Sequence, residues 1–115
     1  MAFYVYIVRC SDGSFYTGHT DDLPRRIAQH NAGYIQGYTH HRRPVTHVFS
    51  EDFPERIDAL ERERQIKGWS RRKKEALIAG DWEMIRRLST THGWSSERVA
   101  LRLFVNLTDH DNTEN

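Results

Sequence analysis

The sequence contains a single cysteine, Cys10, among its 115 residues. A lone thiol excludes an internal disulfide framework and a Cys-x-x-Cys metal ribbon, and it is typical of a reducing compartment. A chain of this length buries roughly two-thirds of its unfolded surface on folding. We therefore expect a cytoplasmic protein that is stabilised by a packed core.

Long apolar runs are also missing. No stretch approaches the roughly 18 consecutive apolar residues that a membrane-spanning helix needs. The apolar start, from Met1 to Val8, lacks a basic lead-in and a small-residue cleavage site. It therefore indicates a strand rather than a signal peptide, and we expect no membrane partner.

A large excess of one charge is absent too, because the formal net charge at pH 7 is +1. The distribution of charge says more. Between Pro24 and Pro44 there are four arginines, three histidines and no acidic residue. Such a stretch attracts a polyanion such as nucleic acid, or it is a solvated loop whose arginines serve solubility. Charge alone does not separate these two interpretations.

Hydrophobic and turn patterns predict an α/β protein, more narrowly α+β, with a small three-stranded antiparallel sheet flanked by helices. Runs of β-branched and aromatic residues predict strands at 3–9, 15–19 and 45–50, the first two joined by an Asp-Gly turn. Capping residues and closing glycines predict helices at 23–32, 54–67, 71–79 and 82–89. The segment 34–44 lacks periodicity and is predicted to be a loop.

Two finer expectations concern the interior. In the second predicted helix we expect Ile57, Leu60 and Ile66 to face the core. Gly18 lies inside a predicted strand, where it is expected to let a ligand or another backbone approach closely, with a bulge as the alternative.

The C-terminal part has no clear pattern. Residues 99–107 suit either a helix or an extra strand, and the polar, acidic residues 108–115 are predicted to be disordered. We find no repeat and no low-complexity linker. We therefore expect one domain over 1–90 and a C-terminal extension over 91–115, partly a disordered tail, in which 99–105 would dock a partner or form a homodimer.

A set of polar and aromatic residues occurs along the chain in a recognisable order. Its members are Tyr4-Val5-Tyr6, Tyr16-Thr17-Gly18, Arg26, His30 and Glu63. Singly, each is more often a core aromatic, a surface residue or half of an exposed ion pair. Together they resemble the GIY-YIG nuclease superfamily, in particular its small stand-alone bacterial branch related to the UvrC N-terminal endonuclease domain. The resemblance covers roughly two-thirds of the chain.

The resemblance implies a divalent-metal-dependent endonuclease that hydrolyses DNA phosphodiester bonds with one Mg²⁺ or Mn²⁺ ion. By position the resemblance implies that Glu63 binds the metal. Glu61 would bind it in the alternative register of the alignment. Arg26 would clamp the scissile phosphate through two hydrogen bonds, which lysine does not mimic. The resemblance also implies a tyrosine as general base.

Between the two tyrosines we prefer Tyr6 as the base and Tyr16 as the group that orients water and phosphate. His30 lies four residues after Arg26 on the same helix face, where it would position the nucleophile or contact phosphate.

Stand-alone relatives have a lysine-containing loop after the first helix, where this chain has Gly33-Tyr34-Ile35-Gln36-Gly37. The phosphate contacts are therefore expected to fall to the basic residues that follow, while a second basic cluster near Trp69 would track DNA or decorate an exposed helix. Tyr34, Tyr38 and Trp69 are expected to be exposed and to stack bases, with a place in the core as the alternative for Trp69. The residues expected to contact nucleic acid are Gly18, His19, Arg25, His40, His41, Arg42, Arg43, Lys67, Arg71, Arg72 and Lys73.

Two alternatives to an independent nuclease stay open: a non-catalytic nucleic-acid-binding module, and a nuclease subunit that depends on a partner. The pathway is equally open between DNA repair, recombination and restriction, and so is the strandedness of the DNA. No pair of histidines shows a zinc-finger spacing, so we expect no structural zinc.

Overall fold

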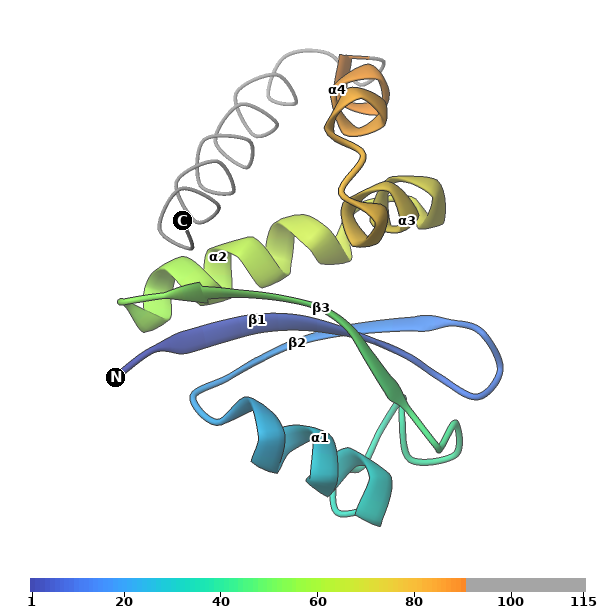
Figure 1. Ribbon diagram of the computed structural model, residues 1–115. Coiled ribbons are helices and arrows are strands. Elements are labelled where there is room, and N and C mark those ends of the chain that lie inside the picture. Colours follow the sequence, from blue (N-terminus) through green and yellow to red (C-terminus); the bar gives the residue numbers. More distant parts are fainter. Residues whose placement is uncertain (91–115) are drawn as a thin grey trace. The chain divides into compact units, whose positions relative to one another are not determined.

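The structure is a computed structural model that describes residues 1–90 (Figure 1). The predictions for 91–115 lie outside the described residues. Two compact units are present, one formed by Met1–Trp69 and one that begins at Ser70. The elements are β1 (Phe3–Arg9), β2 (Phe15–Thr20), α1 (Leu23–Ala32), β3 (Thr46–Phe53), α2 (Arg56–Lys67), α3 (Arg71–Ala79) and α4 (Trp82–Thr90). The strands form the predicted three-stranded antiparallel sheet, and within the first unit α1 and α2 flank it. The predicted domain boundary at residue 90 stays a prediction.

The first unit is a three-layered arrangement in which the sheet lies between α1 and α2 (Figure 1). The strand order is β2-β1-β3, and both pairings are antiparallel. The central strand β1 is therefore covered on both faces, and its residues Val5 to Val8 are buried. Because side chains alternate along a strand, Tyr6 and Val8 face the α1 layer, where Leu23 and Ile27 pack against them.

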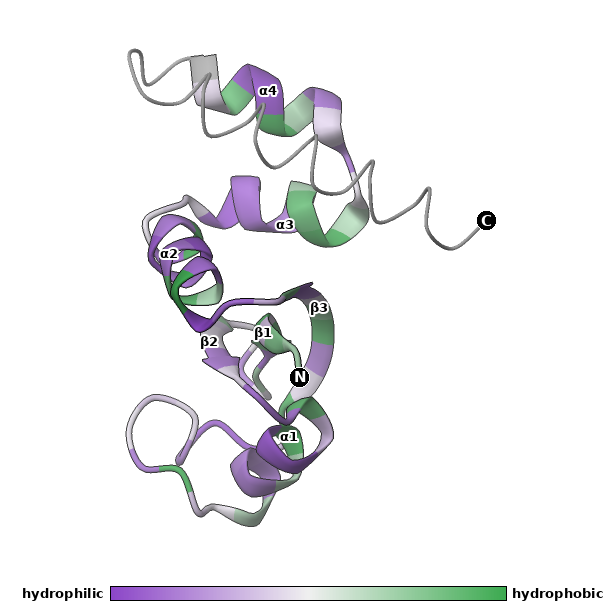
Figure 2. Cartoon of the chain, turned by 90° about the vertical axis from the view of Figure 1, so that its left-hand side faces the viewer, coloured by the Kyte–Doolittle hydropathy of each residue, from purple (hydrophilic) through white to green (hydrophobic). Residues whose placement is uncertain are grey.

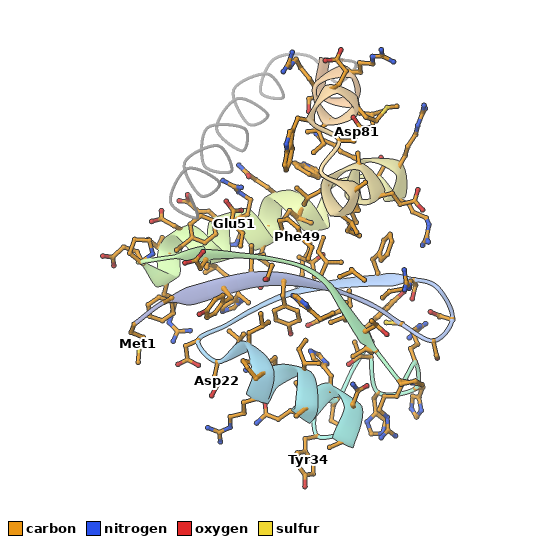
Figure 3. The ribbon with its side chains drawn as sticks, viewed as in Figure 1. Met1, Asp22, Tyr34, Phe49, Glu51 and Asp81 are labelled. Carbon is orange, nitrogen blue, oxygen red and sulfur yellow. The ribbon has the colours of Figure 1, made fainter. Side chains whose placement is uncertain are left out.

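Local signals fix the ends of the early elements as predicted. Asp22 caps α1 by accepting a hydrogen bond from the Arg25 amide at 3.2 Å, and Gly33 ends the helix in the left-handed conformation. The turn between β1 and β2 contains Asp12, whose carboxylate accepts the Ser14 amide. Asp22 lies at the start of α1 in Figure 3.

Two boundaries differ from prediction by more than one residue. The strand β3 extends to Phe53 rather than ending near Ser50, because its whole length pairs with β1 as far as Phe3. The helix α2 consequently begins at Arg56 and not at Pro54.

The expected interior face of α2 was partly wrong. Ile66 is fully buried as predicted, but Ile57 is 57% exposed. The buried face instead includes Arg62, whose guanidinium lies 2.8 Å from the Glu51 carboxylate of β3. Glu51 is drawn beside α2 in Figure 3, and hydrophilic residues predominate on that helix (Figure 2). A buried ion pair takes part of the inner face of α2, where apolar residues were expected. The prediction from the apolar residues therefore failed for Ile57.

In the second unit, α3 and α4 contact each other. The first half of α3 is hydrophilic and its second half is hydrophobic (Figure 2). Ala76 and Leu77 of α3 are buried, and so is Ile85 of α4. Ser70 caps α3, and Gly80 ends it in the left-handed conformation. Among the described helices, none combines the length and apolar character required to cross a bilayer.

Candidate active site

The first part of the site is the pairing of Tyr6 on β1 with Gly18 on β2, which are direct cross-strand partners. A Cβ atom added to Gly18 would lie 2.6 Å from the phenol oxygen of Tyr6, far inside van der Waals contact. Gly18 therefore makes room for the Tyr6 side chain. This corrects the expectation that a ligand or another backbone approaches there, and since Gly18 is itself buried it acts through Tyr6.

Behind this pair runs a buried chain of hydrogen bonds, which we name the phenol–imidazole chain (Tyr6, His30 and Thr39). The phenol oxygen of Tyr6 lies 2.7 Å from Nε2 of His30, and Nδ1 of His30 lies 2.8 Å from the hydroxyl of Thr39. The three side chains are 2%, 1% and 1% exposed. Both ring nitrogens of His30 are therefore engaged within the protein. Its two expected roles, positioning the nucleophile or contacting phosphate, stay predictions.

Burial disfavours charge along this chain. It lowers the pKa of His30 from its ordinary value of 6.5, and the neighbouring Arg26 charge lowers it further. Burial also raises the pKa of Tyr6 well above its ordinary value of 10, with a smaller contribution from Tyr16. At neutral pH the chain therefore holds a neutral imidazole against a neutral phenol.

Tyr16 lies beside this chain in a more open position. Its ring centroid is 5.4 Å from that of His30 and 6.5 Å from that of Tyr6, and it stacks at 6.1 Å on Tyr38. Within residues 1–90 its phenol oxygen takes part in no hydrogen bond to the protein. Tyr16 is thus the phenol that is available to a bound molecule.

Arg26 stands one turn before His30 on α1 and is half-buried. Its charge lowers the pKa of both Tyr6 and His30, so its guanidinium lies close to the two ends of their hydrogen bond. Among the described residues no carboxylate pairs with it. A guanidinium that no carboxylate neutralises is suited to bind a phosphate through two parallel hydrogen bonds.

On the α2 side of β2 lies a second arrangement, which we name the glutamate cluster (Glu63, His19 and Lys67). Glu63 is 8% exposed; Nδ1 of His19 contacts one of its carboxylate oxygens and Nζ of Lys67 lies 2.9 Å from the other. Burial alone would raise the pKa of Glu63, but hydrogen bonds and charge from Lys67 and His19 hold it below its ordinary value. Glu63 is therefore ionised at neutral pH.

The alternative register is disfavoured by exposure, since Glu61 lies on the surface while Glu63 points inward. The two arrangements meet around the edge strand β2. Nζ of Lys67 is 5.8 Å from the Tyr16 ring centroid, and the Glu63 charge contributes to the raised pKa of Tyr6. The structure thus brings together all five residues expected to be catalytic: Tyr6, Tyr16, Arg26, His30 and Glu63.

The donor set at Glu63 fits one kind of metal site. Among residues 1–90 no group of three or more His, Cys, Asp or Glu side chains gathers to form a cage. Mg²⁺ usually keeps several waters and is held by one or two carboxylates together with substrate phosphates. A single ionised glutamate therefore suits Mg²⁺ or Mn²⁺ bound with substrate. His19 and Lys67 each engage one oxygen of Glu63, and a carboxylate has about four lone-pair sites, so an ion would share Glu63 with these residues or replace one of them.

The residues expected to bind nucleic acid fall into different environments. His40, His41 and Arg43 line an open hollow of about 450 Å³, together with Asn31 and Pro44.

Arg42 differs from its neighbour. Its Nε lies 3.1 Å from the Asp12 carboxylate, its Nη1 donates to the Tyr38 carbonyl at 2.8 Å, and its guanidinium stacks over the Tyr38 ring at 4.0 Å. Arg25 is exposed on α1.

The second basic cluster is only partly at the surface. Arg71 and Arg72 are exposed, whereas Lys73 is 5% exposed and burial lowers its pKa. Lys73 was therefore wrongly placed on a DNA-tracking face, because a buried ammonium does not reach a phosphate backbone.

The aromatic residues expected to stack bases also differ among themselves. Tyr34 is 78% exposed and points away from α1 (Figure 3). Tyr38 is exposed but already contacts Tyr16 and Arg42, and Trp69 is half-buried.

Sequence reasoning missed the role of Thr39 altogether. It also missed Asn31, whose side chain donates to the Val45 carbonyl at 3.1 Å and accepts from the Val45 amide at 2.7 Å. These two bonds fix the entry to β3 against α1. Both residues lie in stretches that carry the family resemblance, but a lone Thr or Asn in such a stretch does not reveal its partner.

Comparison with known proteins identifies the family. The family model of the GIY-YIG catalytic domain matches residues 2–76. A UPF0213 protein of Halobacterium salinarum is 50% identical over 75 residues, which cover 65% of this chain and 97% of that protein. A UPF0213 protein of Halalkalibacterium halodurans is 45% identical over 94 residues, covering 79% of this chain and all (100%) of the other.

Among solved structures, the solution NMR structure of the E. faecalis protein EF2693 is 36% identical, with a TM-score of 0.50, and the match covers 70% of this chain and 85% of that one. The match to the family model extends over more than half of the chain, and the relatives are aligned over nearly their whole length. The chain therefore belongs to the GIY-YIG family, whose catalytic domain it carries over residues 2–76.

Proposed function

We propose that this protein is a divalent-metal-dependent endonuclease that hydrolyses DNA phosphodiester bonds at the β2 edge. The observation that carries the proposal is the hydrogen bond of 2.7 Å between Tyr6 and His30, across β2 from the ionised Glu63. Beside it lies the guanidinium of Arg26, which pairs with no carboxylate among residues 1–90. The family suggests a nuclease in general. The metal, the DNA substrate and the roles below are our proposal.

Tyr6 is proposed as the general base, with His30 as the group that takes its proton. Because burial makes a free phenolate unfavourable, Tyr6 accepts a proton from water as its own proton passes to Nε2 of His30. The neutral state of His30, favoured by its lowered pKa, is what allows it to accept. The resulting hydroxide attacks phosphorus, the bond to the leaving oxygen breaks, and that oxygen is protonated from solvent.

The remaining residues bind and orient. Arg26 holds the scissile phosphate through its guanidinium, and Tyr16 orients water and phosphate through its uncommitted phenol. A Mg²⁺ or Mn²⁺ ion held by Glu63 would, when bound, stabilise charge on the phosphoryl and leaving oxygens. Arg43, His40 and His41 contact the DNA backbone away from the cleaved bond.

The test is a cleavage assay on labelled single-stranded, duplex and branched DNA, with Mg²⁺ or Mn²⁺ against EDTA. Glu63→Gln removes the charge of the metal ligand at nearly constant shape. Its matched control is Glu61→Gln, two residues away on the same helix and exposed. We expect metal-dependent cleavage in the wild type and the control, and a loss of at least about 10³-fold in Glu63→Gln, since metal stabilisation of the transition state is worth several kcal/mol.

Other outcomes have definite meanings. DNA binding that survives EDTA and Glu63→Gln, with no cleavage of any substrate by the wild type, would overturn the enzyme and support the non-catalytic binding module. Equal loss of cleavage in Glu61→Gln and Glu63→Gln would overturn the assignment of the metal ligand.

A further inference from the structure

We propose that Thr39 is a positioning residue of the active site, whose hydroxyl accepts the Nδ1–H of His30 and so turns the lone pair of Nε2 toward the Tyr6 phenol. The inference rests on the proposed function for its catalytic meaning. Its geometric part concerns the protein alone and is tested without DNA.

The position of Thr39 gives it no other evident task. It lies in the segment 33–45 between α1 and β3, yet its side chain is 1% exposed. Its hydroxyl lies 2.8 Å from Nδ1 of His30, and no other side chain within residues 1–90 contacts that nitrogen by a hydrogen bond. The Thr39 hydroxyl is therefore the side-chain partner of Nδ1 in this part of the chain.

The loop around Thr39 is itself fixed. The amide of Arg42 donates to the Thr39 carbonyl at 3.0 Å, and the amide of His40 donates to the Gly37 carbonyl at 3.2 Å. Arg43 adds a bond from its Nε to the His40 carbonyl at 2.9 Å. These bonds hold the hydroxyl at one distance from His30.

The chemistry of the proposed proton transfer requires an acceptor at this point. When Nε2 receives the Tyr6 proton, His30 becomes an imidazolium, in which both ring nitrogens are donors. Nδ1–H is enclosed, so it needs a hydrogen-bond acceptor, because a buried unsatisfied donor of a charged group is strongly unfavourable. Thr39 is the acceptor present.

A hydroxyl is also the suitable kind of acceptor. A carboxylate at Nδ1 would raise the pKa of His30 and protonate it in the resting enzyme, which would prevent it from taking a proton. The uncharged hydroxyl of Thr39 leaves the pKa of His30 lowered, while it still stabilises the imidazolium that forms during the reaction.

The first experiment measures the tautomer of His30 by ¹⁵N NMR of its ring in the DNA-free protein. Thr39→Val keeps the shape but removes the acceptor, and Thr39→Ser restores a hydroxyl. We expect the wild type and Thr39→Ser to carry the proton on Nδ1 at pH 7.5, and Thr39→Val to lose this preference. A proton on Nε2 in the wild type, or an unchanged tautomer in Thr39→Val, would overturn the proposal.

The second experiment measures single-turnover cleavage against pH. We expect Thr39→Val to cleave about tenfold more slowly with unchanged DNA affinity, as for other groups that orient a functional histidine, and its acidic limb to move to lower pH. Thr39→Ser should recover most of the rate. A loss that is the same at every pH and is not recovered by serine would mean a purely structural role. If the wild type itself does not cleave, the proposed function fails, while the tautomer still decides the placement of Thr39.

Discussion

The two arrangements around β2 each contain a histidine, and they treat charge in opposite ways. In the phenol–imidazole chain, burial keeps Tyr6 and His30 neutral. In the glutamate cluster, cationic neighbours keep Glu63 ionised in spite of its burial. One strand therefore separates a neutral buried pair from an ionised carboxylate. The proposed mechanism uses both, since it assigns proton transfer to the first and the metal to the second.

The largest effect on cleavage should come from a substitution of Tyr6, which ends the phenol–imidazole chain. Tyr6→Phe removes the proposed base, and we expect cleavage to fall by about 10²–10⁴-fold, the usual contribution of general-base catalysis. Tyr16→Phe is the matched change on β2, and it should reduce cleavage less because Tyr16 only orients. Single-turnover rates at saturating DNA and metal measure both. A larger loss in Tyr16→Phe than in Tyr6→Phe would reverse the two roles.

A second way to disrupt the phenol–imidazole chain is to change the packing around Tyr6. Gly18→Ala places a methyl group 2.6 Å from the Tyr6 phenol oxygen, so either the strand or the ring must move. We expect the free energy of unfolding to fall by about 1–3 kcal/mol, the usual range for overpacking. Thermal or urea unfolding measures the change.

The cause of that loss is checked by a double-mutant cycle. On a Tyr6→Ala background the ring is absent, so Gly18→Ala should cost much less. An equal cost in both backgrounds would show that the strand, and not the tyrosine, requires glycine at this position.

Sequence patterns predicted most of the strands and helices because their causes are local. Hairpin chemistry at Asp12 and the caps Asp22 and Gly33 act within a few residues of the elements they bound. The order of the five motif residues likewise predicted which side chains would meet, since the family relation carries the tertiary information that local patterns lack.

Two of the failures share a physical cause, which is that charged residues were assumed to stay outside. Arg62 of α2 is buried against Glu51 of β3, and Lys73 is buried as well. Thr39 was missed for a related reason: its partner His30 lies in another element, across the end of α1. A partner that is distant in sequence leaves no periodic signal in a single chain.

The pH dependence of cleavage tests the role of His30 in the phenol–imidazole chain without a mutation. Because the folded pKa of His30 is lowered from 6.5, His30 is mostly neutral at pH 6.5 and above, and it becomes protonated as the pH falls through that lower value. We expect a plateau at neutral pH and a loss of up to about tenfold per pH unit below the lowered pKa. Rates at saturating metal measure it. An acidic limb centred above pH 6.5 would contradict His30 as the proton acceptor.

The smallest effect concerns DNA binding outside the reacting centre, where two adjacent arginines differ. Arg42 is committed to Asp12 and stacks on Tyr38, whereas Arg43 pairs with no described carboxylate and borders the basic hollow. We expect Arg43→Gln to weaken binding of uncleaved DNA several-fold and to reduce the slope of log affinity against log salt by about one. Arg42→Gln should leave the slope nearly unchanged.

Fluorescence anisotropy in EDTA, over a range of salt concentrations, distinguishes the two variants because no cleavage occurs. A slope reduced equally by both substitutions would mean that Asp12 releases Arg42 when DNA binds. The ion pair would then be a resting contact that competes with phosphate. A slope reduced only by Arg43→Gln assigns the hollow to the DNA backbone and leaves Arg42 to hold the hairpin turn against the loop.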